Sequence, residues 1–92
     1  MLKIKQAIIV EGKYDKIRLS NLVDAMIIPT NGFELYKNKE TAELIKMLSK
    51  KTGIIILTDS DSAGFQIRSR LRNITRGGEV INVYIPDIIG KE

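Results

Sequence analysis

The stretch IIILTDSD, residues 54–61, decides the predicted fold of this chain. Its first four residues are apolar without polar alternation, which is typical of a strand that is buried on both faces of a parallel sheet. Asp59 and Asp61 follow at once, and sites in parallel sheets form beyond the carboxyl ends of the strands. Residues 54–57 are therefore expected to form a central strand whose carboxyl end presents two acidic side chains.

A second apolar run, AIIV at residues 7–10, has the same character and ends at Glu11. Around these two runs, short segments rich in β-branched residues alternate with segments that carry apolar residues at helical spacing. The predicted strands are 7–10, 25–28, 54–57 and 80–85, and the predicted helices are 13–23, 39–51 and 63–74. In the first helix the residues expected to face inward are Ile17, Leu19, Leu22 and Val23.

The alternation of strand and helix indicates an α/β fold with three layers. In this Rossmann-like arrangement, helices cover both faces of a four-stranded parallel sheet. A flavodoxin-like strand order, 2-1-3-4, makes the first and third predicted strands neighbours. Glu11, Asp59 and Asp61 would then converge at one edge of the sheet. Converging carboxylates repel one another, and a Mg²⁺ ion that binds oxygen ligands and substrate phosphate removes that cost.

Composition narrows the chemistry further. The 92 residues contain no cysteine and no histidine, which excludes disulfides, zinc sites of the Cys/His kind, and Ser-His or Cys-His catalysis. The net charge of +4 and the pI of about 9.5 favour polyanionic partners, although the same excess also serves solubility. No apolar run reaches the ~18 residues of a membrane span, so we expect a cytoplasmic protein without a membrane partner.

A purely structural explanation stays open for each acidic residue. Asp59 or Ser62 could cap the third predicted helix, and Asp15 could interact with the dipole of the first. An isolated Asp-x-Asp in a loop is more often structural than functional. The matched position of acidic residues at two strand ends is what favours a site.

The two strand ends together resemble the signature of the Toprim domain, which bacterial primases, type IA and type II topoisomerases, recombination-repair proteins and small ribonucleases share. In that family one hydrophobic strand ends in Glu-Gly and a later one ends in Asp-x-Asp, as at residues 8–15 and 55–64 here. The resemblance implies that residues 1–92 form a single Toprim domain. Closer similarity to the ribonuclease type that matures 5S ribosomal RNA rests on residues 10–13, 30–32 and 58–68. Residues 62–64 also resemble the primase version.

The resemblance implies roles for the residues that match the signature. Asp59 and Asp61 become the main Mg²⁺ ligands, with Mn²⁺ able to substitute. Glu11 becomes either a third ligand or a general acid/base. Lys13 would complete the catalytic set by holding a phosphate oxygen, and Gly12 would let the backbone turn sharply and a phosphate approach closely.

A further set of residues is expected to contact nucleic acid: Gly12, Lys13, Asn31, Gly32, Gly64, Phe65, Arg68 and Arg72. Asn31-Gly32 is also a strong turn signal in its own right. Arg68 and Arg72 lie one helical turn apart in a stripe that Arg76 extends, which suits a phosphate backbone but also an ordinary solvated helix face. Phe65 is a candidate for stacking on an unpaired base.

Together with these features, the resemblance implies a Mg²⁺-dependent endoribonuclease that acts on structured RNA, as in 5S rRNA maturation. Because ribonucleases of that type carry an additional C-terminal domain, the expected partners are RNA together with such a domain or a ribosomal protein. Two other classes stay open: a nucleic-acid-binding module without activity of its own, and primase-related nucleotidyl transfer. Phosphoryl transfer through an aspartate fits less well, because phosphatases carry Asp-x-Asp on the first strand and receiver domains need a different acidic pattern.

Overall fold

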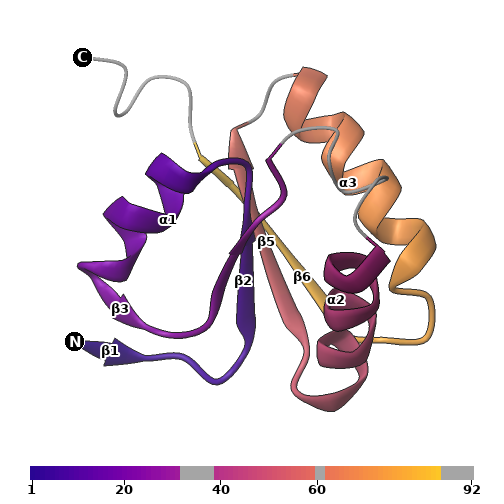
Figure 1. Cartoon of the computed structure of the whole chain (residues 1–92), viewed down its shortest axis with the longest axis horizontal. Coiled ribbons are helices and arrows are strands. Elements are labelled where there is room, and N and C mark those ends of the chain that lie inside the picture. Colours follow the sequence, from indigo (N-terminus) through magenta and orange to yellow (C-terminus); the bar gives the residue numbers. More distant parts are fainter. Residues whose placement is uncertain (32–38, 60–61, 86–92) are drawn as a thin grey trace.

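The computed structural model describes residues 1–31, 39–59 and 62–85. Its elements in chain order are β1 (Leu2–Lys3), β2 (Ala7–Val10), α1 (Lys13–Ser20), β3 (Val23–Asp24), β4 (Ile27–Pro29), α2 (Lys39–Lys51), β5 (Ile54–Asp59), α3 (Ser62–Ile74) and β6 (Val80–Ile85). Helix α1 covers one face of the central sheet, and α2 and α3 cover the other (Figure 1). The predicted three-layer α/β fold is confirmed. None of the described helices has both the length and the apolar character required to cross a membrane.

The central sheet has four parallel strands in the order β4-β2-β5-β6. The four predicted strands correspond to β2, β4, β5 and β6, so this order is the expected 2-1-3-4. The structure adds a small parallel pair, β1 with β3, which was not predicted. Strand β2 lies in the middle, where Ile9 is paired with Ile28 on one side and with Ile56 on the other. All carboxyl ends of the sheet therefore meet at one edge.

Alternate residues of β2 point to opposite faces, so this strand contributes to two separate cores. The larger core lies beneath α2 and α3 and contains Ala7, Ile9, Ile28, Ile45, Ile54, Ile56, Ile67 and Leu71. The smaller core lies on the α1 side, and its fully buried residues are Ile8, Val10 and Ile27. Since β2 is covered on both faces, all four of its residues are buried. This packing fixes the position from which Glu11 emerges.

The helix predicted at 13–23 is shorter in the structure. Asn21 caps α1 with its backbone N–H, and Val23–Asp24 forms β3, which pairs with β1. Ile17 and Leu22, both expected to face inward, are 55% and 67% exposed. The reason is that α1 lacks a continuous apolar stripe and packs on the smaller core mainly through Leu19.

Gly78 brings the turn before β6 into close contact with α2. A Cβ added at this position would lie 2.3 Å from Ser49 Oγ, 2.7 Å from Ser49 Cβ and 2.9 Å from the Ser49 carbonyl carbon. The next residue, Glu79, donates its backbone N–H to the Ser49 carbonyl at 2.8 Å, which holds the two segments at this distance. The missing side chain is therefore required by a close approach of two backbones.

Gly78→Ala is expected to lower the free energy of unfolding by about 1–3 kcal/mol, because the added methyl group overpacks a buried contact. Thermal denaturation should show a Tm lower by roughly 5–15 °C. In a double variant with Ser49→Gly, which removes both side-chain atoms from the contact, the added cost of Gly78→Ala should be smaller. A Gly78→Ala variant as stable as the parent chain would contradict this packing.

Candidate active site

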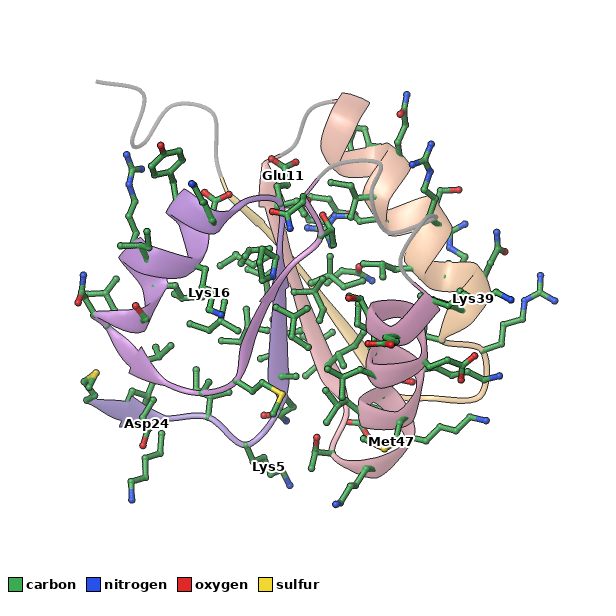
Figure 2. All side chains as sticks on the ribbon, in the orientation of Figure 1. Lys5, Glu11, Lys16, Asp24, Lys39 and Met47 are labelled. Carbon is green, nitrogen blue, oxygen red and sulfur yellow. The ribbon has the colours of Figure 1, made fainter. Side chains whose placement is uncertain are left out.

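The carboxyl end of β2 presents Glu11 at one edge of the sheet, opposite the edge where Lys5 lies (Figure 2). The Glu11 backbone carbonyl oxygen accepts hydrogen bonds from the Asn31 backbone N–H at 2.8 Å and from Thr30 Oγ1 at 3.2 Å. The Thr30 N–H donates to the Val10 carbonyl at 2.9 Å, which continues the β2–β4 ladder beyond its paired residues. Glu11 is thus held by its backbone, and one carboxylate oxygen, Oε1, is shielded from solvent.

Asn31 adopts the left-handed conformation expected of a turn residue, with φ at +55°. Its observed part in the site is to fix Glu11 through its backbone N–H, whereas contact with nucleic acid stays a prediction. Gly32 lies outside the described residues. Thr30 was missed by sequence reasoning, although it is 3% exposed and directly follows a strand end, which is a usual place for a β-branched hydroxyl residue that bonds to backbone.

Gly12 lies in the bend between β2 and α1, as expected, but this bend does not require a glycine. Its φ of −140° and ψ of 174° are extended values that any residue adopts, and an added Cβ would meet only Asp15 Oδ2, at 3.9 Å. The Gly12 N–H donates to Asp15 Oδ2 at 3.1 Å, so Asp15 supplies the acidic half of a capping arrangement for α1. Lys13 begins α1 as an exposed side chain, with Nζ 5.6 Å from the ring centroid of Tyr14.

The end of β5 brings Asp59 to the same sheet edge as Glu11. The β2–β5 register pairs Ile9 with Ile56. Two residues further along each strand, Glu11 comes level with Thr58, and Asp59 is the next residue. No three acidic, histidine or cysteine side chains form a metal-binding group within 1–31, 39–59 and 62–85. Asp61 and the side chain of Asp59 lie outside what the structure describes.

Arg68 lies inside the protein, contrary to the expectation that it contacts RNA phosphates. The residue is 4% exposed, and its guanidinium bonds within the chain. Nε donates to Thr58 Oγ1 at 3.0 Å, Nη1 donates to Asn82 Oδ1 at 2.7 Å, and Nη2 donates to the Val83 carbonyl. The guanidinium carbon also lies 3.7 Å from the ring centroid of Tyr84. Arg68 therefore joins α3 to β5 and β6. Its contact with β5 is at Thr58, the residue that precedes Asp59.

The positive charge of Arg68 interacts electrostatically with Glu11 of the candidate site. Burial lowers the pKa of the Arg68 guanidinium from its ordinary value, and interactions with Tyr84 and Glu11 act in the opposite direction. The group stays protonated at neutral pH because an arginine pKa starts so high. A buried positive charge thus interacts with the Glu11 carboxylate.

The donor set at this edge fits a hard divalent cation. Glu11 and Asp59 come from neighbouring strands, and carboxylate oxygens are the ligands that Mg²⁺ and Mn²⁺ prefer. The burial of Glu11 Oε1 strengthens its interaction with a nearby cation, because the local dielectric constant is lower than that of water. These residues are the ones that would hold such an ion.

The remaining predicted residues lie on α3. Gly64 is in its first turn, Arg72 is exposed on its surface, and Phe65 is 53% exposed with its ring centroid 6.1 Å from that of Tyr84. Asn82 and Tyr84 of β6 were not predicted as site residues. Strand alternation is the signal that places both on the same side of β6, facing α3.

Comparison with known proteins supports the α/β fold, and the matched region includes the acidic residues at the ends of β2 and β5. The Toprim domain family matches residues 6–88. Ribonuclease M5 of Mycoplasma capricolum is 44% identical over 87 residues, which are 92% of this chain and 47% of that protein. Ribonuclease M5 of Borreliella burgdorferi is 48% identical over 71 residues, which are 77% of this chain and 38% of that protein.

The chain spans less than half the length of these two relatives. The family match nevertheless covers most of the sequence, and it includes the Glu-Gly end of β2 and the Asp-x-Asp that begins at the end of β5. The parallel sheet with helices on both faces is the fold that this resemblance implied. The chain therefore belongs to the Toprim domain family.

Proposed function

We propose that this chain carries out Mg²⁺-dependent cleavage of phosphodiester bonds in structured RNA, of the kind needed to mature 5S ribosomal RNA. The observation that carries the proposal is the placement of Glu11 and Asp59 at the ends of two neighbouring parallel strands. The likeness to proteins named Ribonuclease M5 supports RNA as the substrate. The cytoplasm, where RNA is processed, is the corresponding location.

Each residue of the proposed site has a distinct part. Asp59, Asp61 and Glu11 would hold the cation, which when bound neutralises charge on the phosphoryl group and can activate water. Lys13, exposed at the start of α1, holds a phosphate oxygen as a point charge. Gly12 presents a backbone without a side chain beside that phosphate, since space around its Cβ position is open. Arg68 keeps Thr58, and with it the end of β5, in place.

A second candidate is a nucleic-acid-binding module that needs another protein segment or a ribosomal protein to cut. The observation that favours this candidate is that the match covers only 47% and 38% of the length of the two relatives described above. Under this alternative the cation and RNA still bind, but the substrate is not oriented for attack. The two candidates share the site and differ in whether the chain alone is sufficient.

A cleavage assay separates them. A 5S rRNA precursor with both flanking extensions is incubated with the chain in Mg²⁺, in Mn²⁺ and in EDTA, with and without ribosomal proteins that bind the precursor. The nuclease proposal expects cleavage at defined positions in either metal and none in EDTA. Metal-dependent RNA binding without cleavage by the chain alone would favour the module instead, and cleavage that persists in EDTA would contradict the metal mechanism.

A further inference from the structure

Strand β6 forms one edge of the central sheet, and its outer side is open in the part of the chain that the structure describes. It pairs with β5 along its whole length, and no strand within residues 1–31, 39–59 and 62–85 lies on its other side. Residues 81–84 are all exposed, and the whole strand, VINVYI at residues 80–85, carries no charge. An uncharged six-residue strand with an open edge is a template for pairing with another strand.

The opposite edge of the sheet, formed by β4, is protected against such pairing. The Ile8 N–H donates to the Met26 carbonyl at 2.8 Å. Because backbone groups alternate in direction along a strand, the even-numbered residues of this segment face β2, whereas Ile27 and Pro29 face outward. Pro29 has no N–H to donate, and β4 is only three residues long. Of the two edges, β6 is therefore the one that offers a complete row of donors and acceptors.

The direction of the backbone groups on β6 follows from one hydrogen bond at its start. The Ile54 N–H donates to the Glu79 carbonyl at 3.0 Å, so the odd-numbered residues of this segment face β5 and the even-numbered residues face outward. The outward-facing residues are Val80, Asn82 and Tyr84. Arg68 leaves this row open, since its backbone acceptor on β6 is the carbonyl of Val83. The outer row thus presents three N–H donors and three carbonyl acceptors.

We propose that β6 pairs antiparallel with β6 of a second copy of this chain, about a twofold axis at Asn82. Asn82 then lies opposite its own counterpart, and Val80 lies opposite Tyr84 of the second copy. Six hydrogen bonds between the chains use every outward-facing backbone group of both strands. On the other face of the sheet, Ile81 comes opposite Val83 of the second copy, so the closest side-chain pairs are apolar. A second copy is the expected partner because the strand is complementary to itself.

This pairing stands independently of the proposed function. Because the two strands run antiparallel, the carboxyl edges of the two sheets face opposite directions, and both candidate metal sites stay open. No charge of one β6 lies opposite a charge of the other. Each copy nevertheless carries a net charge of +4, so repulsion between whole chains opposes association. The dimer should therefore become stronger as the salt concentration rises.

Sedimentation equilibrium measures the pairing directly. Over about 1–200 μM chain, the range expected for a small interface, the mass should rise from 10.4 kDa toward twice that value. Ile81→Lys/Val83→Lys puts like charges opposite each other at two positions and should weaken association at least about 10-fold. The control Met26→Lys/Met47→Lys adds the same charge at exposed apolar residues outside β6 and should change association less than about 2-fold. A mass that stays at 10.4 kDa, or equal effects of the two variants, overturns the proposal.

Cross-linking tests the register and does not depend on the folding of the lysine variant. The chain has no cysteine, so each introduced thiol is unique. With oxidised glutathione as the oxidant, a mixture of Ile81→Cys and Val83→Cys chains should form a disulfide-linked dimer, since the paired Cα atoms would lie about 4.5 Å apart. Either chain alone should cross-link at least about 10-fold more slowly, because its thiols are then on diagonal positions roughly 7–8 Å apart. Equal rates for the mixture and the separate chains would contradict the antiparallel pairing.

Discussion

Asp59→Asn is expected to weaken Mg²⁺ binding at least about 100-fold and to abolish metal-dependent RNA cleavage. Residues that only support a metal ligand typically contribute 10- to 100-fold to affinity, so a direct ligand should cost at least the upper figure. Asparagine keeps the size of the side chain and one oxygen, and Asp59 is the last residue of β5, so the strand should still form. Isothermal titration with Mg²⁺ or Mn²⁺ measures the affinity directly. RNA binding in EDTA should survive, because it does not depend on this carboxylate.

Matched controls separate the site from a general loss of negative charge. Asp24→Asn makes the same change on an exposed residue of β3, on the other side of the protein from Glu11 (Figure 2), and should leave metal affinity within about 2-fold. Glu11→Gln should also weaken binding, whereas Glu43→Gln on the exposed side of α2 should not. If Asp59→Asn binds metal as well as Asp24→Asn does, Asp59 is not a ligand.

Arg68→Ala is expected to lower the free energy of unfolding by about 2 kcal/mol and the Tm by roughly 10 °C. Its removal leaves the buried Thr58 hydroxyl and the Val83 carbonyl without their donor, and it takes the guanidinium away from the Tyr84 ring. Arg68→Lys should recover little, because an ammonium group cannot reproduce three directed hydrogen bonds from one planar group. Thermal denaturation followed by circular dichroism measures both variants.

Arg72→Ala is the control for stability, since Arg72 lies one turn later on α3 and is exposed. Its effect should stay within about 0.5 kcal/mol. Metal affinity is a second readout for Arg68→Ala, because the variant frees Thr58 immediately before Asp59, and a drop of roughly 10-fold is expected below the unfolding temperature. If Arg68→Ala leaves both stability and metal affinity unchanged, Arg68 does not hold Thr58 and the end of β5 in position.

The central sheet could be predicted because its strands are short runs of β-branched residues with clear ends. The runs at 7–10 and 54–57 could be assigned without tertiary information, because short continuous apolar runs rich in β-branched residues are typical of strands covered on both faces. In the structure residues 7–10 are all buried, whereas Ile55 and Leu57 are half-buried. The strand order was that of a flavodoxin-like sheet, and it placed Glu11 and Asp59 at one edge, as the structure does. The end of α1 was misjudged because Ile17 and Leu22 mimic an inward stripe although both are exposed.

The role of Arg68 could not be read from the sequence. The spacing of four residues between Arg68 and Arg72 indicated that both lie on one exposed stripe of the helix. In the structure the orientation of α3 on the sheet buries Arg68 and leaves Arg72 in solvent. The bonds to Thr58 and Asn82 join residues 10 and 14 positions away, and no local pattern encodes which partner a long side chain reaches. Tyr84 was missed for the same reason, since its neighbours Arg68 and Phe65 come from another element.

The most direct measurement is anomalous diffraction from crystals of the chain soaked in Mn²⁺. A strong anomalous peak within bonding distance of carboxylate oxygens from Glu11 and from at least one of Asp59 and Asp61 is the predicted result. The account would be contradicted by crystals in which both strand ends are ordered, the Glu11 carboxylate points away from the aspartates, and no ion lies between them.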